Sequence, residues 1–330
     1  MQPTRGMTVR RRVLLRVLAP TLALLLAMAG SVTALNGTVY GAGGFTRAYL
    51  ESLGRGAVEQ ALGTAGVVLP EGDRALLADG VPDGPQRVRI VADEALEDGR
   101  RAVTAEYELE GEPASSRFVV ERDGSRFGVF SEWRFAEPPV ATVAVQVLGD
   151  YRFQAPGLST GDPSAIGQPQ PYLALVPSAY ELHHRTTYLE APQQLARVVE
   201  PGSVVAATIE PRPTEHFLGE VQGVIDEHLD SCAEQTVLFP SGCPFGTAID
   251  DRVLDAPQWS IDAHPRITIE RAEEPGVWRV PATPAAARIE AQVQSIFDGS
   301  IRELDEERAF TVAYDVLIRS DDSLLVEALY

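Results

Sequence analysis

Lysine is absent from the 330 residues of this chain, so all 28 positive charges are arginines. A phosphate-binding P-loop needs Gly-Lys-Ser or Gly-Lys-Thr, and Schiff-base chemistry needs a lysine amine, so both are excluded. Asparagine occurs once, at Asn36, and cysteine occurs twice. The net charge of −19 argues against a nucleic-acid partner, because binding to the phosphate backbone requires a basic face.

Charge of either sign is missing from the 19 residues between Val17 and Leu35. At about 1.5 Å per residue this segment spans about 28 Å as a helix, close to the hydrocarbon thickness of a bilayer. Residues 1–36 carry five arginines and no acid, so the rest of the chain carries −24. Arginines before the segment place that end in the cytoplasm and the bulk of the chain outside it.

These features predict a short basic cytoplasmic tail (1–16) followed by a single-pass transmembrane signal anchor (17–35). A cleavable signal peptide is the alternative, because Val32-Thr33-Ala34 has the small-x-small pattern of a cleavage site. The chain would then be secreted after cleavage near Ala34. The absence of cysteine near the segment excludes a bacterial lipoprotein.

The remaining residues have the apolar (45%) and charged (23%) fractions of a globular protein, long enough for two or three domains. Gly41 to Gly44 is expected to be a flexible tether. Residues 41–137 are expected to form a first α+β domain, in which helices start the domain and Asp123-Gly124 makes a hairpin turn. The strands are expected at 86–92, 101–110, 117–121 and 126–135.

Residues 138–210 are predicted to form a small β-rich module, with a loop rich in glycine and proline at 156–171. Its strands are expected at 141–148, 172–176, 186–190 and 204–209. Residues 211–330 are predicted to form a second α+β domain. Thr214 is the expected N-cap of its amphipathic helix, and the strands follow at 259–269, 277–280, 287–297, 309–318 and 324–328.

Both α+β segments resemble the nuclear-transport-factor-2-like (cystatin-like) cone, in which helices sit in a curved antiparallel sheet. The first carries FTRAYLESLGRGAVEQAL, RAVTAEYELE and RFGVFSEWRF, and the second carries the helix after Thr214, WSIDAHPRITI and GVWRV. With its membrane segment, the chain is similar to actinobacterial envelope proteins and, more distantly, to the teicoplanin-resistance-associated membrane proteins of Gram-positive bacteria. The zinc ribbon common in such proteins is missing, because no cysteine precedes the membrane segment.

Three patterns that resemble reactive sites are better explained structurally. Gly157 to Gly161 matches Gly-x-Ser-x-Gly, but it lies in the most loop-like part of the chain and not between a strand and a helix. His183 and His184 follow Glu181 closely, yet adjacent side chains of a strand point to opposite faces, so a surface or edge position is expected and no metal site. The acidic runs at 93–98 and 303–307 lack the spacing of a calcium loop and are expected in solvated turns or on helix faces.

His228 lies on the apolar stripe of the predicted helix, so it faces the interior of the second cone. A buried imidazole there is either a general base or a core histidine with one hydrogen bond. His228 and Trp259 are therefore the candidate pocket residues. No catalytic set, cofactor or metal is predicted.

Cys232 and Cys243 are predicted to form a disulfide, since both lie in the exported part, where thiols are usually oxidised. Phe239 to Gly242 supplies residues typical of a turn that returns the chain to the helix. A zinc site would need further ligands, and the spacing is far from Cys-x-x-Cys.

The sequence favours a monomeric, non-enzymatic binding or scaffolding protein of the bacterial envelope, whose partner is a cell-wall component or another envelope protein. The alternative is a small-ligand-binding protein or enzyme that uses the pocket of the second cone.

Overall fold

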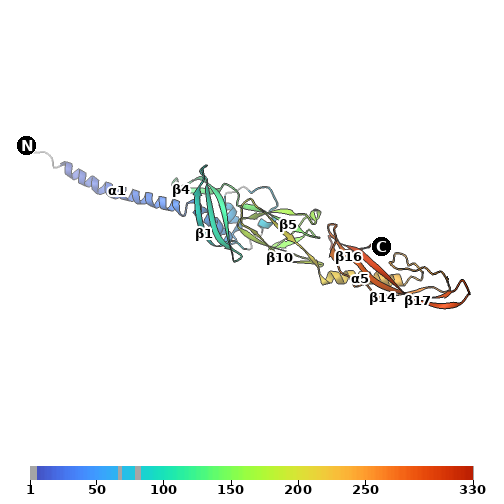
Figure 1. The fold of residues 1–330 in the computed structure, drawn as a ribbon. Helices are drawn as coiled ribbons and strands as arrows, with labels where there is room; N and C mark the ends of the chain where they lie inside the picture. Colours follow the sequence, from blue (N-terminus) through green and yellow to red (C-terminus); the bar gives the residue numbers. More distant parts are fainter. Residues whose placement is uncertain (1–5, 66–68, 79–82, 330) are drawn as a thin grey trace, which may run out of the picture. The chain divides into compact units, whose positions relative to one another are not determined.

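The computed structural model describes residues 6–65, 69–78 and 83–329, which form a mixed α+β fold with mostly antiparallel sheets (Figure 1). The chain divides into two compact units. Unit 1 comprises Met1–Ala144, Pro171–Glu181 and Leu195–Ala206. Unit 2 comprises Val145–Gln170, Leu182–Gln194 and Ala207–Tyr330. The three-module division of the exported part stays a prediction.

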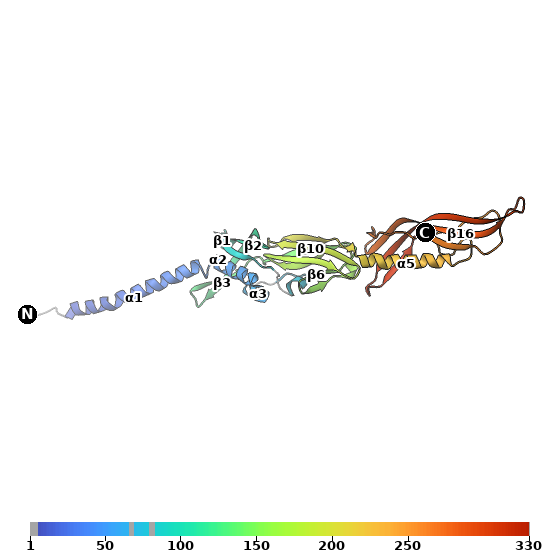
Figure 2. The ribbon, with the colours of Figure 1, turned by 90° about the horizontal axis from the view of Figure 1, so that it is seen from below.

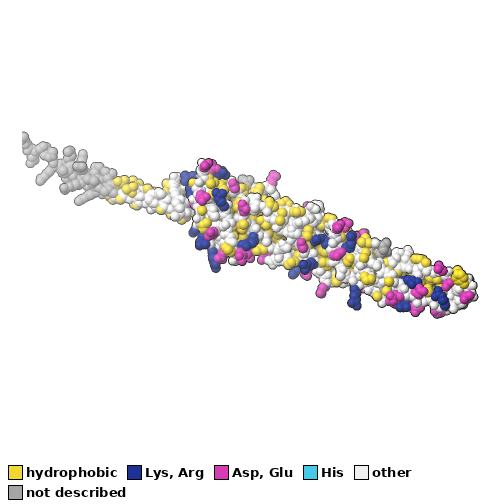
Figure 3. Space-filling view, viewed as in Figure 1, with side chains coloured by type: hydrophobic (Ala, Val, Ile, Leu, Met, Phe, Trp, Pro, Cys, Tyr) yellow, Lys and Arg dark blue, Asp and Glu magenta, His cyan; other side chains and the backbone are white. Residues whose placement is uncertain are grey.

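Helix α1 (Gly6–Gly37) contains the predicted apolar segment. The stretch Pro20–Gly37 is long and apolar enough to cross a membrane, and none of it is buried within the protein. Figure 3 shows hydrophobic side chains along the described part of this helix. Ser31 and Thr33 donate hydrogen bonds to the carbonyls of Ala27 and Ala29, so their hydroxyls are satisfied without water.

The glycines expected to form a tether instead lie at the start of helix α2 (Ala42–Gly54). A Cβ atom at Gly44 would lie 2.3 Å from the carbonyl oxygens of Thr38 and Val39. Glycine is therefore needed because two backbone segments approach closely, and the prediction of a flexible tether is wrong.

An antiparallel four-stranded meander packs against α2. The side chains of Tyr49, Phe118 and Phe135 form the aromatic centre of this core, and the Tyr49 hydroxyl donates to the Val176 carbonyl at 2.8 Å. Two short helices connect α2 to the sheet. The elements are α3 (Val58–Ala65), α4 (Ala75–Ala78), β1 (Gln86–Ala95), β2 (Arg101–Leu109), β3 (Glu112–Arg126) and β4 (Phe130–Phe135).

The β3–β4 turn does not lie at Asp123-Gly124. Gly124 is inside β3, at a register shift opposite Glu132. The turn follows Arg126, where Phe127 and Gly128 both have positive φ angles (55° and 72°). Such a pair matches the twist of a hairpin, and the Asp-Gly signal marked a bulge instead.

Residues 140–213 form two small sheets, with orders β11-β5-β8 and β12-β10-β9-β6-β7. The predicted 156–171 loop is wrong in part, because residues 157–161 lie in a β6–β7 hairpin and Ser159 is on a strand. The sequence also missed β9. The elements are β5 (Val140–Val147), β6 (Phe153–Ala155), β7 (Leu158–Thr160), the 3-10 helix η1 (Pro163–Ala165), β8 (Gln170–Leu175), β9 (Ser178–Arg185), β10 (Leu189–Val198), β11 (Val204–Ile209) and β12 (Arg212–Pro213).

Helix α5 (Glu215–Ala233) begins as predicted, with the Thr214 hydroxyl accepting the Phe217 N–H at 3.1 Å. Its buried face packs into the core of unit 2, and Figures 1 and 2 show it lying along a six-stranded antiparallel sheet. The strands are β13 (Arg252–Val253), β14 (Gln258–Ala263), β15 (Glu270–Arg271), β16 (Val277–Gln294), β17 (Ile301–Ile318) and β18 (Leu324–Ala328).

Three expectations in this part were wrong. The strand predicted at 259–269 ends at Ala263, the last residue of β14. The strands predicted at 277–280 and 287–297 are one strand, β16, whose register shifts between Val280 and Thr283. The acidic run 303–307 lies within β17 and not in a turn or on a helix, where it pairs with Arg288 to Gln292. The strand tolerates these acidic side chains because β17 alternates between buried and exposed positions, and the acidic side chains point to solvent.

Candidate functional site

Strand β9 separates the histidines that the sequence singled out. Leu182 and His184 point inward and are buried, whereas Glu181 and His183 on the other face are half-buried. The two imidazoles therefore lie on opposite faces, as the period of a strand requires. The expectation of a surface or edge position is wrong for His184, which is almost completely buried on a strand between β10 and β6.

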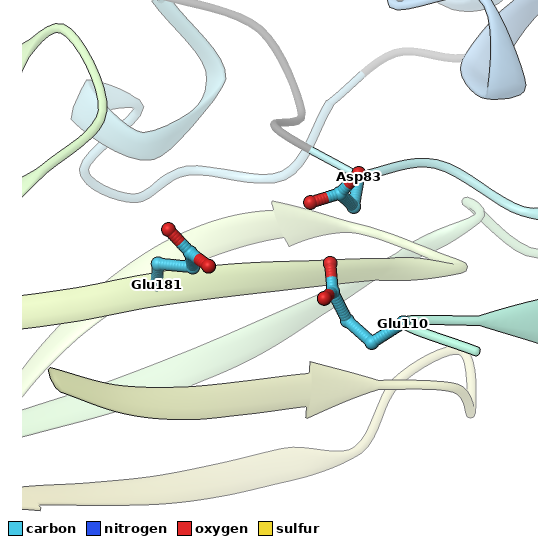
Figure 4. A group of neighbouring side chains, drawn as sticks. All are labelled: Asp83, Glu110 and Glu181. Carbon is cyan, nitrogen blue, oxygen red and sulfur yellow. The ribbon is translucent and has the colours of Figure 1, made fainter. Parts of the chain in front are cut away.

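Glu181 instead meets two carboxylates from distant parts of unit 1. One oxygen each from Asp83, Glu110 and Glu181 lies within 4.8 Å of the others (Figure 4). Asp83 is held beside β9 by an isolated bridge to Ala179. Glu110 follows β2 at the turn into β3, with a φ angle of 53°.

The neighbouring carboxylates change the pKa of Glu110. A hydrogen bond with Asp83, together with desolvation and the charges of Asp83 and Glu181, raises the pKa of Glu110 to about 7. The positive charge of Arg197 opposes this shift. The Arg197 guanidinium also donates to the carbonyls of Leu109 and Glu112, at 3.1 and 3.4 Å, and so holds the turn that carries Glu110.

Three carboxylates so close together repel one another when all are ionised, which favours the protonated form of Glu110. The same oxygens are the ligand type that a hard divalent cation accepts. Sequence reasoning missed Asp83 and Glu110, since they are separated by 27 positions and neither belongs to a recognisable metal-binding motif.

A buried polar group lies in unit 2, around Asp150. Its carboxylate accepts the backbone N–H groups of Tyr151 and Arg152 at 2.5 and 3.0 Å and pairs with the Arg152 guanidinium at 2.9 Å. His184 Nδ1 lies 2.7 Å from the Arg152 carbonyl, and its Nε2 lies 3.7 Å from Asp150. Arg152 also pairs with Asp322.

Burial lowers the pKa of His184, although the hydrogen bond to the Arg152 carbonyl and the charge of Asp150 act in the opposite direction. This group connects the strand β9 with the loops after β5 and β17. We assign this group a structural role, because the Asp150 side chain is only 5% exposed.

The pocket predicted near His228 lies between α5 and the sheet of unit 2. It has a volume of about 210 Å³, and its lining is mainly apolar: Val224, Ile225, His228, Gly242, Tyr314, Val326 and Ala328. Trp259 is not part of this lining. Its indole packs on Phe245 and donates to the Val237 carbonyl at 2.8 Å.

The Sγ atoms of Cys232 and Cys243 are 2.01 Å apart, which is disulfide distance. Cys232 lies in the buried face of α5, and His228 Nε2 is 3.8 Å from its sulfur. The Gln235 side chain donates to the Cys243 sulfur and to the Ser241 carbonyl. The bridge thus fastens an irregular segment to the helix next to the pocket.

Comparison of the chain with family models, curated proteins and solved structures found no match. The geometry of its own residues is therefore what supports a function.

Proposed function

We propose that this chain is a membrane-anchored binding or scaffolding protein of the bacterial cell envelope, with its bulk outside the cytoplasm. The observation that carries the proposal is the segment Pro20–Gly37, an apolar helical stretch with none of its length buried against the protein. Exposing such a surface to water is unfavourable, at roughly 25 cal/mol per Å² of apolar area, whereas a bilayer accepts it.

Charge and oxidation support the proposed orientation. Five arginines precede the apolar segment, and arginine-rich flanks remain on the cytoplasmic side. The Cys232–Cys243 pair follows it at disulfide distance, and such bonds persist in oxidising compartments outside the cytoplasm.

The relationship to nuclear-transport-factor-2-like cones and to teicoplanin-resistance-associated proteins is also a proposal. Helix α2 against the four-stranded meander and α5 against the six-stranded sheet support it, because each pairs a helix with an antiparallel sheet. Both units fill their cores with large side chains such as Tyr49, Phe118, Phe217 and Trp278, which favours partner binding through outer surfaces.

Fractionation of bacteria that produce the full chain with a C-terminal epitope tag tests the anchor. We expect the protein in the membrane fraction, resistant to alkaline carbonate and released by detergent. External protease added to spheroplasts should remove the tag. Leu25→Arg with Leu26→Arg should abolish membrane retention, because each central arginine costs about 3 kcal/mol.

Val204→Arg is the matched control, since Val204 is an exposed apolar residue outside the span. It should leave retention unchanged. Recovery of the protein in the medium with an N-terminus near Leu35 would show cleavage of the segment and contradict the anchor.

A second candidate function, binding of a small apolar molecule, is favoured by the pocket lined by His228 and Tyr314. We expect the neutral probe N-phenyl-1-naphthylamine to bind saturably to the purified full chain in detergent. Val224→Trp should weaken binding about tenfold or more by filling the entrance, since a blocked pocket loses over about 1.4 kcal/mol. Val237→Trp, exposed outside the lining, is the control. Equal binding by both variants would refute this use of the pocket.

A further inference from the structure

The end of the apolar helix is fixed to the tip of the β3–β4 hairpin by the single asparagine of the chain. The Asn36 amide donates to the Val129 carbonyl at 2.7 Å, and its oxygen accepts the Ser131 N–H at 3.0 Å. Both ends of the side-chain amide are therefore used to hold one hairpin beside the last turn of α1.

Aromatic side chains strengthen this attachment. The rings of Tyr40 and Phe130 stack with their centroids 4.4 Å apart, and the Trp133 indole donates to the Tyr40 carbonyl at 3.0 Å. If Pro20–Gly37 lies in the hydrocarbon region, Tyr40 and the hairpin tip reach the level of the lipid headgroups. Tyrosine and tryptophan are the residues that favour this level.

Three apolar side chains at this place are exposed without a protein contact to cover them fully. Phe127 is 83% exposed, Val39 is 63% exposed, and Val129 is also exposed. The Arg126 guanidinium lies 5.5 Å from the Phe127 ring centroid, and that of Arg122 lies 5.8 Å from the Trp133 ring. We call Val39, Arg126, Phe127 and Val129 the collar.

The hairpin tip and the end of α1 contain no acidic residue, although acids occur nearby at Asp123 and Glu132. Although the protein has 47 acidic residues, none occurs in residues 17–46 or 125–131, and Arg126 is the one charge in these two segments. An anionic membrane surface repels a protein of net charge −19, so close approach is least unfavourable at the hairpin tip, where Arg126 is the one charge between Ser125 and Ser131.

We propose that the collar binds the headgroup region of the bilayer that α1 spans, with Arg126, assisted by Arg122, contacting the phosphates of anionic lipids. Phe127 and Val129 enter the interface, where apolar and aromatic side chains are favoured. The guanidinium groups stay at phosphate level, because arginine combines an apolar stem with a charged, fork-shaped donor group. This inference rests on the proposed membrane anchor and adds a second contact to it.

A single labelled thiol in the full chain tests the proposal. The native cysteines are paired, so Phe127→Cys or Val129→Cys supplies one free thiol for the environment-sensitive dye NBD. Val204→Cys, on an exposed position of β11 in the same unit, is the control. Each protein is reconstituted into vesicles of phosphatidylcholine alone or of equal amounts of phosphatidylcholine and phosphatidylglycerol.

We expect a blue-shifted NBD emission at positions 127 and 129, and quenching by lipids that carry a headgroup-proximal doxyl label. Both effects should be stronger with phosphatidylglycerol, and Arg122→Gln with Arg126→Gln should remove that difference. Position 204 should show neither effect. Equal quenching in both kinds of vesicle would overturn the role of anionic headgroups.

Vesicle flotation separates failure of this inference from failure of the anchor. If the protein does not float with the vesicles, the proposed anchor is wrong. If it floats but positions 127 and 129 are not quenched, the collar does not contact lipid and this inference is overturned. A blue shift without lipid quenching has the same meaning, because protein and not lipid then covers the collar.

Discussion

Reduction of the Cys232–Cys243 pair is expected to lower the free energy of unfolding of unit 2 by about 2–3 kcal/mol. The two residues are separated by 11 positions, and opening a short loop of this kind returns chain entropy to the unfolded state. The stretch 234–251, which contains Cys243, has neither helix nor strand. Its remaining fixed points include the Trp259–Val237 hydrogen bond and the Thr247 N–H bond to the Leu238 carbonyl.

Tryptophan fluorescence measures this effect in one unit at a time. Of the three tryptophans, Trp133 lies in unit 1, whereas Trp259 and Trp278 lie in unit 2. In a Trp133→Phe background, urea unfolding of the full chain in detergent therefore reports unit 2. The comparison is between the same protein with and without a phosphine reductant.

The control for the disulfide is the double variant Cys232→Ala with Cys243→Ala. Its unfolding midpoint should be the same with and without the reductant, and it should match that of the reduced parent protein. A parent that loses less than about 0.5 kcal/mol on reduction would contradict the expectation, since that is the range of neutral surface changes.

Local signals in the sequence were sufficient where one element determined its own structure. The apolar run predicted α1, the Thr214 cap and the apolar stripe predicted α5, and strands such as 204–209 and 324–328 were located to the residue. In each case, the periodicity and the end signals lie within a single continuous segment.

Predictions from local signals were wrong where tertiary packing, and not the local sequence, determined the structure around a residue. Gly41 and Gly44 are glycines because a Cβ atom there would approach carbonyl oxygens at or just after the end of α1, and flexibility is not their role. Gly124 forms a bulge, so the hairpin turn moved to Phe127 and Gly128. The residue type determines which backbone conformations are allowed. The neighbouring segments determine whether a glycine serves in a turn, in a bulge or at a close backbone approach.

The candidate sites show the same limit more strongly. Asp83, Glu110 and Glu181 come together only because a bridge to β9 and the β2–β3 turn bring three separate segments to one place. The position of His228 could be predicted from the sequence, because helix periodicity alone indicates which face of the helix it occupies. The helix face that carries His228 could therefore be predicted, whereas contacts assembled from several elements, such as those of Tyr314 and Val326 in the same lining, could not.

Replacement of Asp150 by alanine is expected to destabilise unit 2 by about 3 kcal/mol, because it leaves a partly buried guanidinium without its main partner. Asp150 accepts two backbone N–H groups and the Arg152 side chain while its own side chain is 5% exposed. Asp322→Ala is the matched control. Asp322 pairs with the same guanidinium but is 46% exposed, so its loss should cost no more than about 1 kcal/mol.

The same group predicts the pH dependence of unit 2. Burial holds the pKa of His184 below its ordinary value of 6.5, so the unfolded chain binds the proton more readily than the folded one. The contribution of His184 to stability is therefore complete above pH 6.5 and is lost as the pH falls through the folded-state pKa. His184→Gln, which keeps a donor for the Arg152 carbonyl, should reduce this acid sensitivity.

Urea unfolding from pH 8 to pH 5 in the Trp133→Phe background measures both the loss of stability on replacing Asp150 and the acid sensitivity due to His184. Equal losses for Asp150→Ala and Asp322→Ala would show that burial does not set the strength of these two ion pairs.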